Sequence, residues 1–183
     1  MKRPLAILIA ACCAVPALAK DKVLLLTPVT YRADASVVQR VREECHIESM
    51  LEQDVGSALK KRLSGGTVDS EAAANGATVL KLQISHVLGV GGGAWSGPKA
   101  LTVYADLVEN GKVVRQARIN RWSTGGVWGG FKGTCSIINR CSVAIAKDLT
   151  RWAADPAYKI EDEAPPKDAA PEDKTTAERQ ETN

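Results

Sequence analysis

The sequence of 183 residues has little excess charge, few aromatic side chains and only two histidines. Its 24 basic and 21 acidic residues leave a formal net charge of +3, which argues against a strongly basic nucleic-acid-binding protein. One histidine, His86, lies on the apolar face of a predicted strand, where packing is a commoner role than proton transfer. No pair of carboxylates stands out as a catalytic acid and base. We therefore predict that the protein is not an enzyme and needs no cofactor.

Long apolar runs are also absent, apart from one near the N-terminus. Residues 1–19 begin with two basic residues within the first three, continue with an apolar stretch and end in Ala17-Leu18-Ala19, which suits a signal peptidase. The stretch is shorter than the roughly 20 residues of a membrane-spanning helix. We predict a signal peptide cleaved after Ala19, and hence a periplasmic protein that is not integral to a membrane. As an alternative, residues 9–12 resemble a bacterial lipobox, which would leave Cys12 as a lipidated first residue.

The small net charge is the sum of three segments of different charge. Residues 1–19 carry +2 and residues 20–159 carry +6, whereas residues 160–183 hold eight acidic and three basic residues and carry −5. This last segment has three prolines and no apolar residue larger than alanine after Ile160. Such a stretch cannot bury enough apolar surface to offset its conformational entropy. We predict a disordered acidic tail or, alternatively, an acidic arm that competes with anionic ligands for the basic body.

Hydrophobic periodicity predicts one α/β domain over residues 20–159. Spacings of three and four residues predict amphipathic helices, and strict alternation predicts half-buried strands. Asn110-Gly111 is a hairpin signal, because a type I′ turn needs positive φ at both central positions. The predicted elements are a strand at 23–26, a helix at 37–63, strands at 80–88, 101–107 and 112–123, and a helix at 134–152. This β-α-β-β-β-α order predicts a two-layer α+β sandwich with helices on one face of a small mixed sheet.

Ten of the 15 glycines fall in two loops, at residues 89–97 and 125–133, on either side of the predicted hairpin. The loops carry Trp95, Trp128 and Phe131, the only phenylalanine. The first loop loosely matches a dinucleotide-binding fingerprint, but a proline and a strand follow it where that motif needs a helix. The spacing of a nucleophile elbow is absent as well. The three rings either pack back over the sheet edge or form a binding lip, and we take them as candidate binding residues.

Two arginines form a second set of candidate binding residues. Arg115 and Arg121 share one face of the predicted strand at 112–123, because they are separated by an even number of residues. A solvated sheet face is the usual meaning of such charges. The alternative is a surface for anionic lipid head groups or cell-wall polymers.

Three cysteines follow the predicted signal peptide, and an exported protein is expected to use cysteines in a disulfide. Cys135 and Cys141 should not pair within one helix, because six residues rise about 9 Å and a bridge tolerates about 7 Å between Cα atoms. Cys45 and Cys135 can pair if the starts of the two helices are neighbours, and Cys141 would then be a buried free thiol. A zinc site of Cys45, His46, Cys135 and Cys141 is the alternative, although it lacks paired ligands at short spacing.

Several stretches resemble small exported proteobacterial envelope proteins, most of them uncharacterised: residues 73–82, the hairpin at 106–114, and Gly133-Thr134-Cys135 at the start of a helix that ends near Trp152. In element order, residues 23–154 resemble the amino-terminal α/β domain of the Tol-system protein TolB and related envelope lipoproteins. The resemblance implies helices over a small mixed sheet and a role in protein interaction, with no catalytic motif. It also supports a disulfide between Cys45 and Cys135, and it gives Cys141 no role.

These observations predict a non-catalytic accessory protein of the periplasmic envelope that binds a protein partner through its loops or its sheet edge. The alternative is a binding module for an anionic cell-wall polymer or lipid head groups, in which Arg115 and Arg121 contact the ligand. A hydrolase is the third possibility. No nucleic-acid partner and no metal are expected.

Overall fold

A computed structural model of the chain describes residues 22–89, 97–124 and 133–166. In these residues the chain forms a six-stranded mixed sheet and three α-helices, which confirms the α/β class. The strands are β1 (Val23–Leu26), β2 (Thr30–Val37), β3 (Gly66–Val68), β4 (Thr78–Leu88), β5 (Lys99–Glu109) and β6 (Lys112–Ser123). The helices are α1 (Gln39–Cys45), α2 (Ile47–Leu63) and α3 (Thr134–Ala154), with one 3-10 turn, η1 (Ala72–Ala74).

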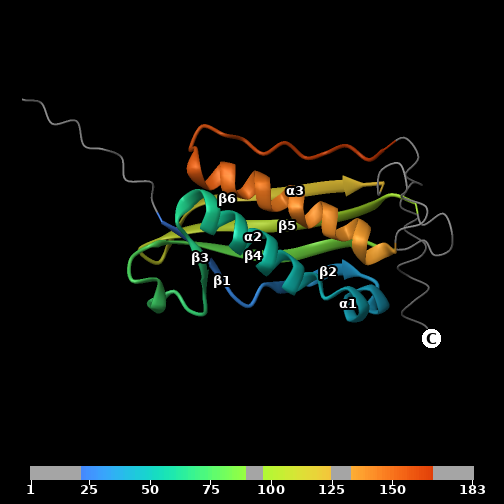
Figure 1. The fold of residues 1–183 in the computed structure, drawn as a ribbon, viewed down its shortest axis with the longest axis horizontal. Helices are drawn as coiled ribbons and strands as arrows, with labels where there is room; N and C mark the ends of the chain where they lie inside the picture. The colour runs from blue at the N-terminus through green and yellow to red at the C-terminus, as the bar shows by residue number, and fades with distance from the viewer. Residues whose placement is uncertain (1–21, 90–96, 125–132, 167–183) are drawn as a thin grey trace, which may run out of the picture.

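The strand order in the sheet is β3-β1-β4-β5-β6, and β2 pairs with β4 beyond the end of β1 (Figure 1). β1 is parallel to β3 and β4, β2 is parallel to β4, and β4, β5 and β6 form an antiparallel meander. At the turn between β5 and β6, Asn110 has a φ of 51° and Gly111 a φ of 74°, the positive values that the sequence predicts. In the strand order of the described sheet, β6 pairs only with β5 and is therefore an edge strand.

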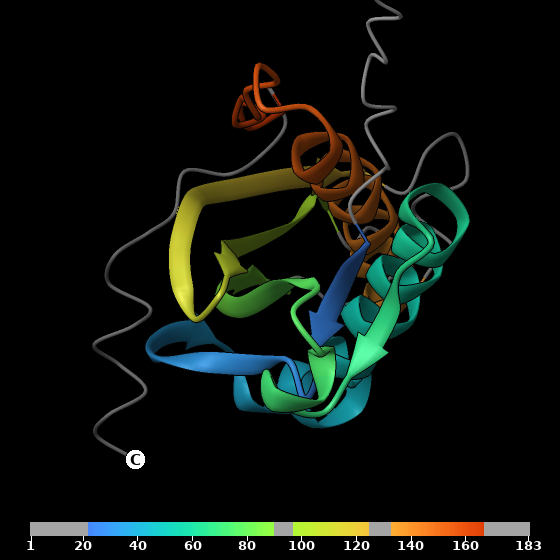
Figure 2. The same ribbon diagram turned by 90° about the vertical axis from the view of Figure 1, so that its left-hand side faces the viewer.

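The helices α2 and α3 pack against each other on one face of the sheet, as the two-layer prediction requires (Figure 2). The apolar stripe predicted for the last helix is buried there, and α3 packs against β5 and β6. The fully buried members of this core include Ile138, Cys141, Ile145 and Leu149 of α3 and Leu80, Ile84, Leu101 and Val103 of the sheet.

The predicted helix at 37–63 is two helices, because the backbone breaks at His46. This residue adopts the left-handed conformation (φ 46°, ψ 53°), so α1 ends at Cys45 and α2 begins at Ile47. Both sides of the break bury apolar residues, which is why the three- and four-residue spacing continues through it. Among the described helices, none is long and apolar enough to cross a membrane.

Two strands, β2 and β3, were not predicted. β2 mixes small, charged and apolar residues, none of them fully buried, and it pairs with β4 after the chain passes Pro28. β3 has only three residues, too few to show an alternation. Both strands are defined by their neighbours β1 and β4, and a pattern within their own residues does not reveal them.

Candidate functional site

The predicted binding lip of Trp95, Trp128 and Phe131 lies outside the described residues. The described ends of both loops lie at one end of the sheet, where Lys99 of β5 pairs in register with Ser123 of β6. The loops therefore begin and end at the same end of the molecule (Figure 1). Whether the three rings bind a partner stays a prediction.

A disulfide joins Cys45, the last residue of α1, to Cys135 in the first turn of α3, with a Cα–Cα distance of 5.0 Å. The predicted bridge is therefore present, and it fastens the two helices beside the loop end of the sheet. The alternative zinc site is not formed, because the bridge uses two of its four proposed ligands. Within the described residues, no other cluster of potential metal ligands occurs.

The third cysteine, Cys141, is a buried free thiol, as predicted. Its Sγ lies 3.7 Å from the main-chain oxygen of Lys99. Burial raises the pKa of the Cys141 thiol to about 12. Because the thiolate is the nucleophilic form, this cysteine belongs to the core and is not a reactive group at neutral pH.

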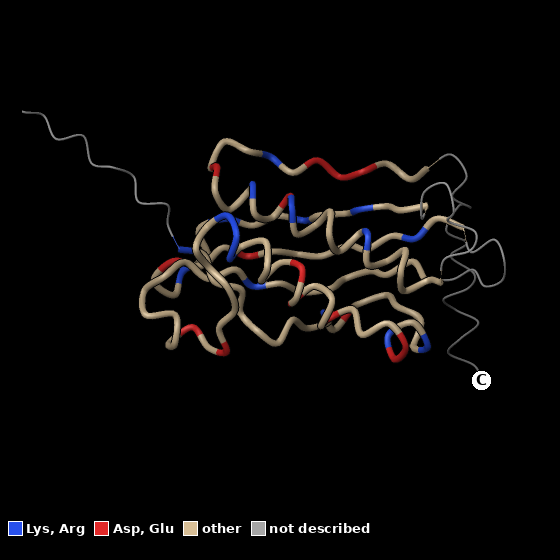
Figure 3. Tube along the Cα trace, in the orientation of Figure 1, with Lys and Arg blue, Asp and Glu red and all other residues tan. Residues whose placement is uncertain are grey.

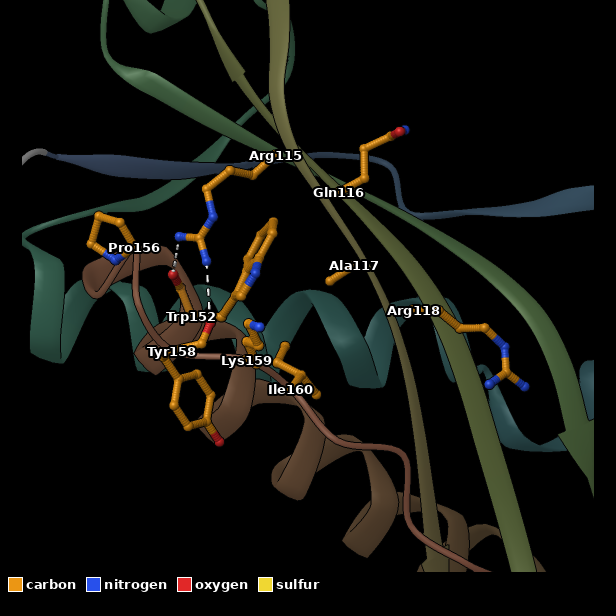
Figure 4. A pocket seen from close by; sticks show the side chains of 9 residues that line it. All are labelled: Arg115, Gln116, Ala117, Arg118, Trp152, Pro156, Tyr158, Lys159 and Ile160. Carbon is orange, nitrogen blue, oxygen red and sulfur yellow. Dashed lines mark hydrogen bonds between the residues drawn. The ribbon is translucent and has the colours of Figure 1, made fainter.

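Arg115, a predicted binding residue, binds the end of α3. Its Nη1 donates a hydrogen bond of 2.6 Å to the main-chain oxygen of Trp152, and its Nη2 donates one of 3.3 Å to that of Tyr158. The guanidinium group also lies over the Trp152 ring, 4.5 Å from its centroid (Figure 4). Arg115 therefore satisfies main-chain carbonyl groups of the last turn of α3 and of the chain that follows it.

Arg121, the second predicted binding residue, forms an ion pair with Asp148 of α3 at 2.6 Å, and both side chains are largely buried. Its Nη1 also donates a hydrogen bond of 2.8 Å to the main-chain oxygen of Glu161. The face that carries Arg115 and Arg121 lies against α3 and the chain that follows it, so it is not a solvated face. Any role of the two arginines in ligand binding stays a prediction.

The chain after α3 returns along the outer edge of β6, in the same direction as that strand (Figure 1). Its first part is held by packing: Tyr158 and Ile160 contact the main core. The guanidinium group of Arg151 lies 4.4 Å from the centroid of the Tyr158 ring. Residues 155–160 are thereby anchored to α3 and β6, and we call them the anchor.

The next three residues, Glu161, Asp162 and Glu163, occupy the edge of β6 with polar groups, and we call residues 161–163 the acidic segment. Asn120 N–H donates to Asp162 Oδ1 at 3.0 Å, and Trp122 N–H donates to Glu163 Oε2 at 2.9 Å. In return, Glu163 N–H donates to the Asn120 main-chain oxygen at 3.3 Å. Figure 3 shows this acidic stretch (red) beside β6 and its basic positions (blue).

An ion pair strengthens the same contact, since the Arg118 guanidinium binds the Asp162 carboxylate. Their side chains are 47% and 40% exposed, so solvent reaches both partners. The acidic segment was predicted as part of a disordered tail. In the described part of that tail, residues 161–163 lie against β6, and the domain boundary at 159/160 stays a prediction.

Between the anchor and β6 the surface is hollowed into an open cleft of about 420 Å³ (Figure 4). Its walls combine cationic and aromatic side chains: Arg115, Gln116, Ala117, Arg118, Trp152, Pro156, Tyr158, Lys159 and Ile160. Arg118 connects the cleft with the acidic segment, because it lines the cleft and binds Asp162. Sequence reasoning missed this surface, because nothing in the sequence shows that the acids at 161–163 lie beside the strand that carries Arg118.

No family model matches the sequence, and no curated protein matches it. Among solved structures, the chain is similar to a PelC dodecamer from Paraburkholderia phytofirmans, with 20% identity, a TM-score of 0.47 and coverage of 76% of this chain and 93% of that one. It is also similar to a DUF330 protein from Xanthomonas campestris, with 14% identity, a TM-score of 0.45 and coverage of 81% and 91%. Similarity at this level assigns neither a family nor a function, and the resemblance to the TolB domain stays a prediction.

Proposed function

We propose that this protein is a non-catalytic, exported protein of the cell envelope that binds a protein partner along the β6 edge of its sheet. The observation that carries the proposal is that no strand pairs with the outer edge of β6 in the described sheet. Main-chain groups of Asn120 and Trp122, which a neighbouring strand would pair, are met by carboxylate side chains of the acidic segment. An edge with donors and acceptors of this kind pairs readily with an extended chain.

Exposed apolar residues at the beginning of β6 also support a binding site for a protein partner on this strand. Val113 and Val114 are apolar residues that are 51% and 47% exposed, and they precede the stretch that the acidic segment covers. Exposed valines beside a strand edge suit a protein partner better than a polymer of sugars or phosphates, because burying apolar area favours protein association.

Export is supported by the disulfide between Cys45 and Cys135. Such bridges form and persist in oxidising compartments, among them the bacterial periplasm. Together with the predicted signal peptide at residues 1–19, the bridge favours a periplasmic location.

The alternative, an anionic polymer or lipid surface, has less support. Arg115 and Arg121 were its candidate contacts, and both guanidinium groups already bind α3 and the chain after it, while Arg121 also donates to the main-chain oxygen of Asn120. A hydrolase has no support among the described residues, whose free cysteine, Cys141, is buried.

Photo-crosslinking in living cells tests the proposal. A crosslinking amino acid at Val114 should give one discrete adduct whose protein component is identified by mass spectrometry. The same amino acid at Lys60, an exposed position on α2, should not give it. The identified partner should bind the purified protein and lose that binding with Val114→Glu. Equal adducts from both positions, or retention on liposomes or cell-wall sacculi that high salt abolishes, would contradict partner binding at β6.

A further inference from the structure

We propose that the acidic segment is a displaceable occupant of the partner site, and that the partner inserts an extended, acidic segment of its own, parallel to β6. The inference rests on the proposed function, because it names what the β6 edge recognises. Its basis is the chemistry of the contacts that residues 161–163 make with this edge.

The edge offers a fixed set of groups to its occupant. Asn120 and Trp122 present N–H donors, and Asn120 presents a carbonyl oxygen that also accepts from Arg121 at 2.7 Å. The Arg118 guanidinium adds positive charge, and the Arg121 guanidinium, paired with Asp148, adds a hydrogen-bond donor. The acidic segment meets this set with two carboxylates, one main-chain N–H and one main-chain oxygen. A partner that satisfies the same groups is therefore extended, and it carries acidic side chains near Arg118.

The occupant is held by contacts that can exchange with solvent. Residues 161, 162 and 163 are all exposed, and the ion pair of Arg118 with Asp162 is open to water on both sides. Exposed ion pairs of this kind are weak and are screened by salt. Release of the acidic segment therefore breaks polar contacts only.

The anchor keeps such a release local. Tyr158 and Ile160 are packed against the core, and Arg115 binds the main-chain oxygens of Trp152 and Tyr158. The chain can therefore leave the edge after Ile160 while α3 and the anchor stay in place.

A partner can outcompete the acidic segment because that segment does not form a regular ladder. Two of its contacts to β6 use side-chain carboxylates where a paired strand would use main-chain oxygens. A longer partner strand can pair its main chain with β6 and still place acids near Arg118. A second copy of this chain has no such advantage, because its identical segment competes with one that is already tethered.

Peptide binding to the full-length protein tests the inference. The probes are a fluorescent peptide of residues 157–166 and a counterpart in which its three acids become Gln, Asn and Gln. The variant D162N/E163Q removes the carboxylates of the tethered occupant, and D69N/E109Q removes two exposed carboxylates elsewhere as a charge-matched control. Fluorescence anisotropy measures the dissociation constants.

We expect D162N/E163Q to bind the acidic peptide at least about tenfold more tightly than the wild type and the control do. The neutral peptide should bind at least about tenfold more weakly than the acidic one, and adding Arg118→Gln should remove the gain. In hydrogen exchange, the amides of Asn120 and Trp122 should lose protection in D162N/E163Q and recover it with the acidic peptide.

Three results would overturn the inference. They are equal affinity of the wild type and D162N/E163Q for the acidic peptide, equal binding of the neutral peptide, and dimers of the wild type formed by exchange of residues 161–163 in sedimentation experiments. If any of these results occurs while a crosslinker at Val114 still captures the partner, the proposed binding at β6 is retained. Only the inference that the partner displaces the acidic segment is then contradicted. Loss of the crosslink would remove the proposed function itself.

Discussion

The Nε of Arg121 lies 2.6 Å from Oδ2 of Asp148, and this ion pair joins the last strand of the sheet to the longest described helix. The side chains are only 12% and 18% exposed, so each charge depends on the other for its compensation. The same guanidinium group binds the main-chain oxygen of Glu161. One side chain thus connects β6, α3 and the acidic segment.

Replacing Arg121 with glutamine should lower the free energy of unfolding by about 2–4 kcal/mol, because it leaves the Asp148 carboxylate buried and unpaired. Urea unfolding followed by circular dichroism measures the change. The control is Arg40→Gln, which breaks an ion pair with Glu44 whose side chains are 81% and 56% exposed, and it should change stability by less than about 0.5 kcal/mol.

A double-mutant cycle separates the ion pair from other effects of the substitution. If the pair carries the loss, Arg121→Gln and Asp148→Asn together should cost clearly less than the sum of the two single changes. Additive effects would mean that the two side chains contribute independently.

Removal of the disulfide should have a comparable or larger effect. The bridge between Cys45 and Cys135 spans a sequence separation of 90 residues. For a loop of this size, the entropy of the unfolded chain predicts a loss of about 4–5 kcal/mol in C45S/C135S. Dithiothreitol should lower the melting temperature of the wild type to that of the variant and leave the variant unchanged. An unchanged wild type under full reduction would contradict this prediction.

The main elements of the fold were predictable because each long element carries its own periodicity. The stripe of α3 and the alternation of β4 and β5 report directly which side chains are buried, and the Asn110-Gly111 turn sets the hairpin. β2 and β3 have no comparable pattern, and the reversal at His46 leaves the helical spacing intact. These features depend on contacts between distant residues.

The candidate site was less predictable than the fold. Arg115 and Arg121 were recognised as a pair on one face, but alternation alone does not say whether a face is covered by a helix or by water. The acidic segment has the composition of a solvated tail, and composition carries no information about a charged strand edge nearby. Only the three-dimensional structure brings Asp162 to Arg118 and Asn120.

Gly65, between α2 and β3, should tolerate no side chain. A Cβ atom at this position would lie 1.7 Å from the main-chain oxygen of Val23 in β1, so the backbone of one segment would have to move. We expect Gly65→Ala to cost about 3 kcal/mol or more. Gly133→Ala is the matched control, because a Cβ there meets nothing within 4 Å, and it should cost less than about 1 kcal/mol. Similar melting temperatures for the two variants would contradict this account of Gly65.

Cys141 should be protected from alkylation in the native protein. Its thiol is buried, and its pKa is raised to about 12, so the thiolate is scarce at pH 8. Iodoacetamide at pH 8 should leave Cys141 unmodified in buffer and modify it fully in concentrated urea, as measured by mass spectrometry. Rapid labelling in buffer would show that this part of the core opens to solvent.

The same raised pKa predicts how stability depends on pH. An unfolded cysteine loses its proton near pH 9, well below the folded value of about 12, so between these values the unfolded chain binds fewer protons and is favoured as pH rises. From pH 8 to pH 10 this group alone should remove about 1–1.5 kcal/mol of stability.

The variant Cys141→Ala tests this pH dependence. It should be less stable than the wild type at both pH values, but it should lack this part of the pH dependence. Urea unfolding at the two pH values measures the difference, with non-reducing electrophoresis to show that the Cys45–Cys135 bridge is unchanged. An identical pH dependence of the wild type and Cys141→Ala would mean that Cys141 ionises alike in both states.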